Sequence, residues 1–453
     1  MTLSIVILAA GQGKRMKSQI PKVLHRLAGK TLLEHVVTTA SRLSPTTIPI
    51  IVYGHQGDHV KRALSHLKAT WVEQTRQLGT GHALQQVLTH IPDEDQILIL
   101  YGDVPLIAVE TLQKLLAAAK TDSIGIITAH FPDPTGLGRI IRDPQNKIIR
   151  IVEEKDASAR ERTISEINSG IYVIPASFLK KWLPTLSNKN AQQEYYLTDI
   201  ISIATQEKFP IYSHESYQYE EVLGVNDKIQ LAAVERFYQR QWANRFMQQG
   251  VTLLDPNRFD VRGDIIIGMD VIIDVNVIIE GNVKIGNQCI IGPNTLLRNV
   301  TLGDYVTIHA NSVIDGAEIA PHCVIGPFAR IRPGTKLSEY VHIGNFVETK
   351  NSIIANATKI NHLTYIGDSE IGTHVNIGAG TITCNYDGID KHKTIIGDHA
   401  FIGSNTSLVA PITIGQGATV GAGSTVTRDA PAEQLTISRA EQRSIIWQRK
   451  TKK

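Results

Sequence analysis

Aliphatic residues return at every sixth position through the second half of the chain. The series opens and closes at these positions: Ile267, Ile273, Ile279, Ile285, Ile291 and Leu297, then Ile396, Ile402, Leu408, Ile414, Val420 and Val426. An α-helix repeats about every 3.6 residues and a strand about every two. A period of six is typical of a hexapeptide parallel β-helix, in which each short strand forms one side of a triangular coil.

Glycine often follows the repeating aliphatic residue, as in Ile291-Gly292 and Ile343-Gly344. We expect the aliphatic side chain to point inward at each corner of the coil, and the glycine to let the backbone bend there. The register slips by one residue at four positions, Leu302, Ile319, Ile354 and Ile371. Because the repeat recovers after each slip, it predicts a β-helix over about residues 262–428.

The first half of the chain, residues 1–226, alternates short aliphatic runs with segments of helical spacing. These runs follow one another as 5–8, 32–40, 48–52, 59–67, 97–100 and 112–119. This alternation predicts an α/β domain with a largely parallel sheet.

A linking helix is expected between the two halves, over residues 227–249. Its apolar residues recur at helical spacing, at Leu231, Val234, Tyr238, Trp242 and Phe246. The second domain then covers residues 250–453. Within it, the polar and glycine-bearing segment 383–393 interrupts the repeat, which predicts an external loop. The basic end, 448–453, is expected to be a frayed terminus.

Composition narrows the class of protein. A chain of 453 residues needs more than one domain. Its 46 Lys and Arg residues against 43 Asp and Glu are too balanced to indicate a nucleic-acid or membrane partner. Its 3 cysteines stand at unrelated spacings, as expected in a reducing compartment. Without a leader or an apolar run of about 20 residues, a cytoplasmic protein is predicted.

A glycine turn with cations follows the first predicted strand, in the sequence LAAGQGKRM. Gly11 and Gly13 let backbone N–H groups approach a phosphate, and Arg15 and Lys22 can neutralise it. A dinucleotide fingerprint would have glycine in place of Met16, and a P-loop would have Ser or Thr in place of Arg15, so both motifs are excluded. An ordinary strand-to-helix turn with surface cations is the alternative.

Asp103 follows the buried run 97–100, which places a carboxylate at the C-terminal end of a strand. Open α/β sheets bind their ligands at that edge, and Mg²⁺ prefers oxygen ligands. The alternative is that Asp103 caps a helix that begins at Pro105.

These motifs carry a family resemblance. LAAGQGKRM, together with QLGTGHA at 77–83 and YGDVPL at 101–106, resembles the signature of the nucleotide-diphospho-sugar pyrophosphorylases. With the β-helix, the whole chain resembles the bacterial bifunctional N-acetylglucosamine-1-phosphate uridyltransferases/glucosamine-1-phosphate N-acetyltransferases. The resemblance implies a Rossmann-like α/β domain, a linking helix and a left-handed β-helix. It also implies synthesis of UDP-N-acetylglucosamine for peptidoglycan and lipopolysaccharide.

The resemblance implies the residues of the uridyltransferase site. It assigns the UTP nucleotide to Leu8, Ala9, Ala10, Gly11, Lys22, Gln74, Gly79, Thr80, Tyr101, Gly102 and Asp103. It assigns the sugar to Gly138, Glu153, Asn168 and Asn226, and Mg²⁺ to Asp103 and Asn226. Arg15 and Lys22 would neutralise charge while a sugar-1-phosphate oxygen attacks the α-phosphorus and pyrophosphate leaves, without a covalent enzyme intermediate.

A second site is expected where the six-residue repeat becomes irregular. Arg332 and Lys350 stand where small residues are expected, close in sequence to His362 and the 383–393 loop, which suggests a phosphorylated ligand. The resemblance assigns glucosamine-1-phosphate to Arg332, Lys350, Tyr365, Asn376 and Lys391, and acetyl-CoA to Ala379, Asn385, Tyr386, Ser404, Ala422 and Arg439. His362 is the expected general base for the amine. Cys384 as an acyl-carrying nucleophile is the alternative.

Two other hypotheses compete with this two-reaction enzyme. In the first, a single-function pyrophosphorylase uses the β-helix only for assembly. In the second, both halves form a non-enzymatic scaffold, as in translation-factor subunits of similar domain order. The family resemblance also implies a homotrimer built through the β-helix, and neither a nucleic-acid nor a membrane partner is expected.

Overall fold

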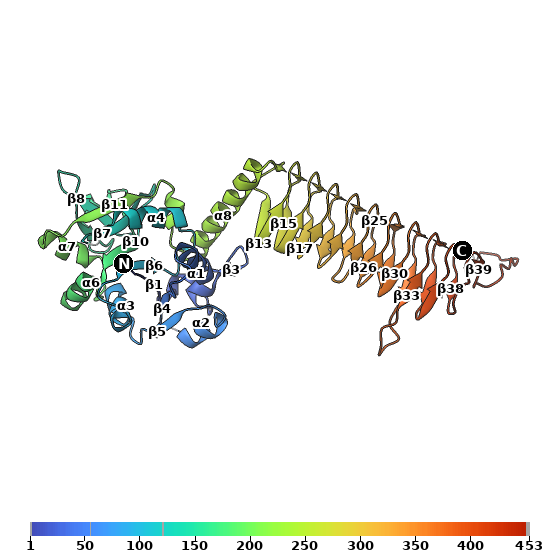
Figure 1. Ribbon diagram of the computed structural model, residues 1–453, viewed down its shortest axis with the longest axis horizontal. Helices are drawn as coiled ribbons and strands as arrows, with labels where there is room; N and C mark the ends of the chain where they lie inside the picture. The colour runs from blue at the N-terminus through green and yellow to red at the C-terminus, as the bar shows by residue number, and fades with distance from the viewer. Residues whose placement is uncertain (1, 55, 120–121, 450–453) are drawn as a thin grey trace. The chain divides into compact units, whose positions relative to one another are not determined.

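The computed structural model of the protein describes residues 2–54, 56–119 and 122–449 (Figure 1). Two compact units divide the chain, Met1–Tyr238 and Gln239–Lys453. Among the described residues, no helix is both long enough and apolar enough to cross a bilayer. The end of the basic tail, 450–453, lies outside the described residues, so its predicted fraying stays a prediction.

The first unit is built on a nine-stranded sheet. Its main path runs β11 (Ile211–Glu215), β7 (Ile124–His130), β10 (Glu166–Pro175), β6 (Gln96–Tyr101), β1 (Leu3–Ala9), β4 (Ile50–Tyr53) and β5 (Thr70–Glu73), with β8 (Arg139–Arg142) and β9 (Ile148–Val152) branching from β10. Strand β10 is antiparallel to its neighbours, whereas β1, β4, β5 and β6 run parallel, as does β11 with β7. The prediction of a largely parallel sheet is confirmed.

Helices cover both faces of this sheet. One face carries α1 (Leu32–Leu43), α2 (Gly57–Ala63) and α4 (Val109–Ala118), and the other carries α3 (Thr80–Gln85), α6 (Ala176–Trp182) and α7 (Asp199–Gln206). Along β6, Ile97 and Ile99 point into one core while Leu98 and Leu100 point into the other. Burial on both sides explains why the strand reads as an unbroken aliphatic run.

Helix α8 (Lys228–Gln248) occupies the segment predicted to link the halves. Its first part belongs to the first unit, where the side chain of Val234 is fully buried beside Met16 and Leu32. Its last part belongs to the second unit, where Phe246 packs against Phe259 in the core. The boundary between the two compact units therefore falls inside the helix.

The second unit is a left-handed parallel β-helix. One face is a sheet of β12 (Thr252–Leu253), β14 (Ile272–Ile273), β16 (Ile290–Ile291), β19 (Thr307–Ile308), β22 (Val324–Ile325), β25 (His342–Asn345), β28 (Lys359–His362), β31 (Asn376–Ile377), β34 (Phe401–Ile402), β37 (Thr419–Val420) and β39 (Leu435–Thr436). A second sheet of 17 strands, which starts at β13 (Phe259–Ile267) and ends at β38 (Thr425–Val426), forms the other faces. The aliphatic ladder fills the interior, so the predicted β-helix is confirmed.

Register between coils explains the slips in the sequence repeat. Three six-residue turns make a coil of 18 residues, as between Ile273 and Ile291. Where a slip occurs, the coil has 17, as between Ile285 and Leu302 and between Leu337 and Ile354. Each slip therefore shortens one coil by a residue without moving an aliphatic side chain out of the core.

The prediction of which residues form the corners of the coil is wrong in one respect. The inward aliphatic residue ends a flat strand, as Ile291 does in β16, whereas the bend comes at later residues with a left-handed backbone, such as Asn294 at φ 58°. Gly344 has no such φ, but a Cβ there would lie 1.9 Å from the Asn361 carbonyl oxygen. Close approach of the next coil, rather than bending, requires this glycine.

Replacing Gly344 by alanine should destabilise the β-helix, because the new methyl group must push the neighbouring coil away. Overpacking of this kind costs about 1–3 kcal/mol in free energy of unfolding. Gly421 is the matched control, since a Cβ there would meet only the flexible Ile437 side chain, at 3.1 Å. Denaturant unfolding of both variants checks this, and equal losses would contradict it.

Candidate functional site

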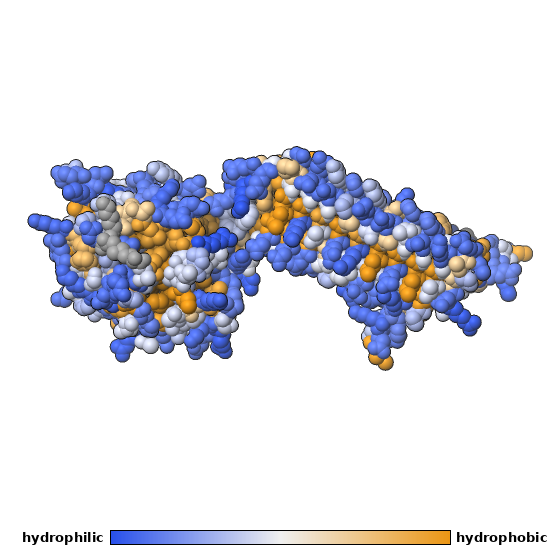
Figure 2. Space-filling model, in the orientation of Figure 1, coloured by the Kyte–Doolittle hydropathy of each residue, from blue (hydrophilic) through white to orange (hydrophobic). Residues whose placement is uncertain are grey.

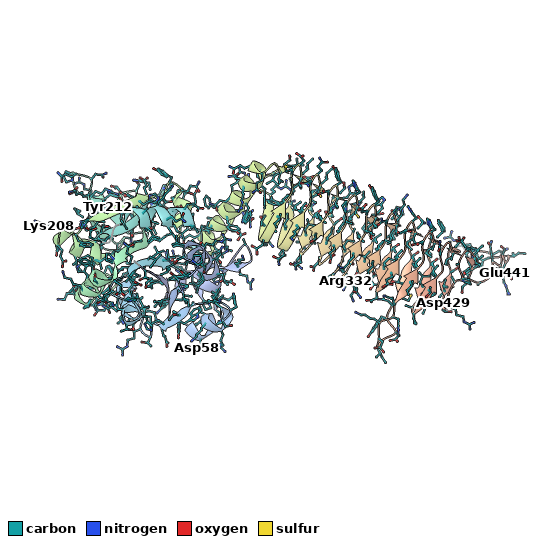
Figure 3. All side chains as sticks on the ribbon, viewed as in Figure 1. Asp58, Lys208, Tyr212, Arg332, Asp429 and Glu441 are labelled. Carbon is teal, nitrogen blue, oxygen red and sulfur yellow. The ribbon has the colours of Figure 1, made fainter. Side chains whose placement is uncertain are left out.

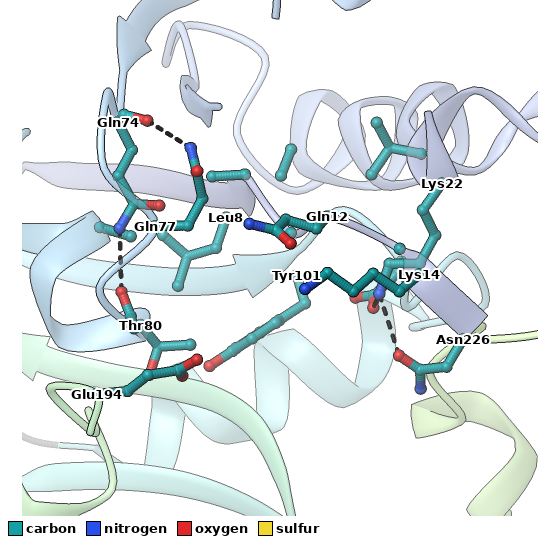
Figure 4. A pocket seen from close by; sticks show the side chains of 18 of the residues that line it. Leu8, Gln12, Lys14, Lys22, Gln74, Gln77, Thr80, Tyr101, Glu194 and Asn226 are labelled. Carbon is teal, nitrogen blue, oxygen red and sulfur yellow. Dashed lines mark hydrogen bonds and ion pairs between the residues drawn. The ribbon is translucent and has the colours of Figure 1, made fainter. Parts of the chain in front are cut away.

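A cavity of about 580 Å³ opens at the C-terminal edge of the first unit's sheet (Figure 4). Residues that follow β1, β5 and β6 line it, as is typical of ligand sites in open α/β sheets. Of the predicted site residues, these line the cavity: Leu8, Ala9, Ala10, Gly11, Arg15, Lys22, Gln74, Gly79, Thr80, Tyr101, Asp103 and Asn226. Gly102 is packed instead against the Ala9 side chain, where a Cβ would lie 3.1 Å away.

At one end of the cavity, a lysine side chain contacts the side-chain oxygens of two other residues. Lys22 Nζ forms an ion pair with the Asp103 carboxylate and donates to Asn226 Oδ1 at 3.1 Å. Asp103 and Asn226 therefore face one point, although 123 positions separate them in the sequence. Helix α4 takes Ala108 as its N-cap, so the alternative that Asp103 caps a helix is wrong.

The other end of the cavity is tightly packed around Gly79 and Gly81. Gly79 has φ 106°, and a Cβ there would lie 2.6 Å from the Tyr195 carbonyl oxygen. The same oxygen accepts a hydrogen bond from Gly81 N at 2.8 Å. The glycines of QLGTG are thus required by close contact with the segment around Tyr195. Gln192 and Glu194 of that segment line the cavity, and no motif in the sequence indicates them.

The residues predicted to bind sugar gather beside Tyr101. Asn168 N donates to Gly138 O at 2.9 Å, and Thr198 Oγ1 donates to Glu153 Oε1 at 3.1 Å. Burial raises the pKa of Glu153, and nearby carboxylates raise it further. Burial also raises the pKa of Tyr101, helped by the charges of Glu153 and Asp103. None of these three predicted sugar-binding residues lines the described cavity, but Tyr101 lies between the cavity and Glu153.

The second predicted site stands on one face of the β-helix. Strands β23 (Arg330–Ile331), β26 (Glu348–Lys350) and β29 (Tyr365–Gly367) bring Arg332 and Lys350 into adjacent coils. Arg332 Nη1 donates a hydrogen bond to Glu348 Oε1 at 2.7 Å. Figure 3 labels Arg332 on the side of the β-helix from which the 383–393 loop projects. The neighbouring Lys391 side chain lowers the pKa of Lys350. Two cations brought this close together make a site for an anion.

His362 ends β28, at the corner that leads to Tyr365. Its Nδ1 lies 2.9 Å from Asn345 Oδ1, and the ring is exposed to solvent. Since the amide oxygen only accepts, Nδ1 carries the hydrogen and Nε2 keeps a lone pair. Asn345, which the sequence analysis missed, thus orients the imidazole so that the lone pair of the neutral ring is on Nε2.

A column of side chains runs along one corner of the coils and starts beside His362. The buried residues Ile343, Ile360, Ile377, Ile402 and Val420 are in register. Two positions after each stand Asn345, His362, Ala379, Ser404 and Ala422. Arg439 joins the far end, where Nη1 donates to the Ala422 carbonyl at 2.5 Å. Four of the predicted acetyl-CoA residues therefore extend from His362 in one line.

The 383–393 loop projects from the coils, as predicted (Figure 1). Its base holds Asn385, which is buried, and Tyr386 pairs with Lys391 across the hairpin. Hydrogen bonds from His392 and from two backbone N–H groups lower the pKa of Asp387 and shape the tip. Cys384 Sγ lies 4.0 Å from the Ile382 carbonyl oxygen.

One predicted sugar-phosphate residue lies apart from the others. Asn376 is on the first face of the β-helix, in register with Lys359 and Phe401. Arg332, Lys350 and Tyr365 belong to the strands of another face. The fold of one chain therefore brings together four of the five predicted residues, counting Lys391 through its contact with Lys350.

Family profiles match both units of the chain. The MobA-like NTP transferase domain matches residues 5–193. The GMPPB C-terminal domain matches residues 261–347, and the hexapeptide repeat of succinyl-transferase matches residues 393–428. Each half of the chain thus has known relatives of its own.

Relatives of full length are also known. The bifunctional protein GlmU of Azoarcus sp. strain BH72 is 53% identical over 451 residues, which cover 99% of this chain and 100% of the relative. The protein of the same name from Legionella pneumophila strain Lens is 54% identical over 459 residues, covering 100% and 99%. A solved nucleotidyl transferase from Methanothermobacter thermautotroptrophicus, at 18% identity, TM-score 0.39 and coverage of 53% and 98%, is too distant to carry an argument.

Replacing Glu153 by glutamine should stabilise the unliganded protein at pH 8 more than at pH 4.5. Because burial raises this pKa above the ordinary 4.5, ionisation costs the folded state free energy that the unfolded chain does not lose. The folded state begins to lose stability as the pH rises from the pKa of Glu153 in the unfolded chain towards its raised pKa in the folded state. We expect about 1 kcal/mol at pH 8.

Thermal unfolding of both proteins at the two pH values measures this difference. Glu94→Gln, at an exposed carboxylate, is the control and should have no effect. A difference that is the same at both pH values would show that Glu153 is not held in an unfavourable ionised state.

Proposed function

Since this chain belongs to the family of bifunctional GlmU proteins, we propose that its two sites catalyse the two steps of UDP-N-acetylglucosamine synthesis. The enzyme is a glucosamine-1-phosphate N-acetyltransferase and an N-acetylglucosamine-1-phosphate uridyltransferase. Similarity over the full length, with both units matched, carries this assignment. It excludes the scaffold hypothesis and the hypothesis of a single-function pyrophosphorylase.

We assign uridylyl transfer to the cavity of the first unit. The phosphates of UTP lie at the cationic end, beside Arg15 and Lys22, and the base lies at the other end, beside Gln74 and Gly79. A phosphate oxygen of N-acetylglucosamine-1-phosphate attacks the α-phosphorus, the bond to the β-phosphate oxygen breaks, and pyrophosphate leaves. The side chains of Lys22 and Arg15 offset the charge that develops on the oxygens. No covalent enzyme intermediate is needed.

Asp103 and Asn226 fit a Mg²⁺ site. Their oxygens face one point, as their shared partner Lys22 shows. Mg²⁺ usually takes only one or two protein oxygens and completes its shell with water and substrate phosphate. When bound, the ion supplies charge neutralisation at the phosphates. Lys22 then turns from these two residues to the nucleotide.

We assign the sugar of the same reaction to Gly138, Glu153 and Asn168. Hydrogen-bonding groups gather there, and the raised pKa of Glu153 supports a pocket that excludes water. A sugar hydroxyl that donates to the Glu153 carboxylate would offset the loss caused by burial.

We assign acetyl transfer to the second unit. The phosphate of glucosamine-1-phosphate lies between Arg332, Lys350 and Lys391. His362 Nε2 takes a proton from the amine as the nitrogen attacks the thioester carbonyl; the carbon–sulfur bond breaks and the thiol of coenzyme A leaves. The hydrogen bond from Nδ1 to Asn345 Oδ1 selects the tautomer of the neutral ring that has its lone pair on Nε2, which supports this role. Because the amine itself is the nucleophile in direct transfer, no enzyme nucleophile is needed and Cys384 is not used.

We place acetyl-CoA along the column that starts at His362. The column carries Ala379, Ser404 and Ala422, whose small side chains leave room for an extended ligand. Asn385 and Tyr386 lie in the loop beside it, and Arg439 reaches its far end. The alignment of these residues with the base supports the placement, because the thioester must come to the amine.

We propose that the enzyme is a cytoplasmic homotrimer. Figure 2 shows hydrophobic residues along the surface of the β-helix. Several aliphatic residues on the strands of its three faces are at least 39% exposed: Ile272, Ile290, Val313, Ile353, Ile382 and Ile395. Flat faces of this kind can pack against copies of the chain, which would also bring Asn376 to a neighbouring site. The three cysteines are unpaired, which supports a reducing compartment.

The variant Asp103→Ala should lose uridylyl transfer and keep acetyl transfer. It removes the carboxylate that pairs with Lys22 and that fits Mg²⁺, so we expect pyrophosphate release to fall at least about 100-fold. Pyrophosphate released from UTP and N-acetylglucosamine-1-phosphate with Mg²⁺ measures this. Asp133→Ala, at an exposed turn, is the control. A variant with full uridylyl transfer would refute the assignment.

The variant His362→Ala, which removes the imidazole, should lose acetyl transfer and keep uridylyl transfer. General-base catalysis is typically worth about 10²–10⁴ in rate, so release of free thiol from acetyl-CoA should fall by that factor. Uridylyl transfer to added N-acetylglucosamine-1-phosphate should be unchanged, but with glucosamine-1-phosphate as the only sugar both signals should disappear. His374→Ala is the control, because that ring stacks on His399 outside the site. Unchanged thiol release would exclude His362 as the base.

A further inference from the structure

Two hydrogen-bond acceptors fix the side-chain amide of Gln74. This residue follows β5, is 3% exposed and lines the cavity of the first unit. Its Nε2 donates to Gly79 O at 3.1 Å and to His82 Nδ1 at 3.0 Å. Both hydrogens of the amide are therefore used within the protein, and in Figure 4 the side-chain oxygen of Gln74 points toward the interior of the cavity.

The orientation of the amide follows from the chemistry of its partners. A backbone carbonyl only accepts, so Nε2 must face Gly79. An imidazole nitrogen accepts only when it carries no hydrogen, so the hydrogen bond from Gln74 requires the neutral ring of His82 with its hydrogen on Nε2. The Gln86 amide nitrogen lies 3.3 Å from Nε2 and donates instead to the His82 backbone carbonyl at 3.1 Å, so it makes no hydrogen bond to Nε2 in this form. Burial lowers the pKa of His82, although a hydrogen bond to the Arg76 backbone raises it. The neutral form that the geometry requires is therefore favoured.

Gln74 lies at the end of the cavity that suits the base. Lys22 lies at the opposite end, as Figure 4 shows, where the phosphates belong, whereas Gln74 and Gly79 carry no charge. The side-chain oxygen of Gln74, which faces the cavity, is then a fixed hydrogen-bond acceptor for the edge of the base. This step depends on the proposed uridylyl transfer, because it takes the orientation of UTP from it.

A fixed acceptor distinguishes the two pyrimidines. Uracil has a hydrogen on N3, which can donate to the Gln74 oxygen. Cytosine has a lone pair on N3, which would face that oxygen and leave two acceptors opposed. A site built to accept a hydrogen rejects the base that lacks it, as long as the amide cannot turn over.

We propose that His82 is a positioning residue for base selection, which holds the Gln74 amide with its oxygen toward the base and so favours uracil over cytosine. The carbonyl of Gly79 belongs to the backbone and cannot be removed by substitution. His82 is the second acceptor, and without it the amide loses half of its restraint. It can then rotate and present its nitrogen to cytosine.

The test is the ratio of kcat/KM for UTP to that for CTP in the full-length enzyme. In His82→Phe, a ring of similar size lacks the acceptor, and we expect this ratio to fall about tenfold, mainly through a higher KM for UTP. His82→Asn is the matched variant, because its amide oxygen stands near the position of Nδ1, and it should keep most of the preference. His82→Leu replaces His82→Phe if that ring does not fit.

The outcomes separate this proposal from the assigned function. An unchanged ratio in both His82→Phe and His82→Leu would overturn the role of His82, as would an equal loss of the preference in His82→Asn. A wild-type enzyme that releases no pyrophosphate from UTP would overturn the uridylyl transfer itself. A kcat for UTP close to that of the wild type reports that the first unit of each variant is folded.

Discussion

Parallel backbone hydrogen bonding between successive coils is the interaction on which the second half of the protein depends. Each coil contacts only its neighbours, so the strands of one coil must lie in register on those of the next. Residues 17 or 18 positions apart are then adjacent in space. Columns of equivalent side chains follow, and His362 on Asn345 and Lys350 on Arg332 are members of such columns. The arrangement of the proposed acetyltransferase site is therefore a consequence of coil stacking.

The two units hold their anionic substrates in different ways. In the first unit, a parallel sheet brings the ends of separate strands to one edge, so that Lys22, Asp103 and Asn226 meet there. In the second unit, the cations come from successive coils and from a loop that leaves them. Both arrangements hold charge in positions that cost stability when no ligand is bound. Burial raises the pKa of Glu153, and the neighbouring Lys391 lowers the pKa of Lys350.

Local sequence patterns predicted most of the fold, because burial must follow the period of the backbone. The six-residue ladder and its one-residue slips indicated the coils, and continuous aliphatic runs indicated strands that are buried on both faces. Family motifs also indicated most residues that line the uridyltransferase cavity. The role of the glycines in the coils was predicted wrongly, since the approach of Asn361 to Gly344 is a contact across a whole coil and leaves no local signal.

By itself, the sequence determined the two architectures, their order and the position of the glycine turn, because each depends on the spacing of neighbouring residues. Only the tertiary structure decided that the Asp103 carboxylate pairs with Lys22, that Asn345 orients His362 and that His82 restrains Gln74. It also decided that Gln192 and Glu194 line the cavity. These are hydrogen bonds and contacts between residues that belong to different elements, and their geometry exists only after the elements have packed.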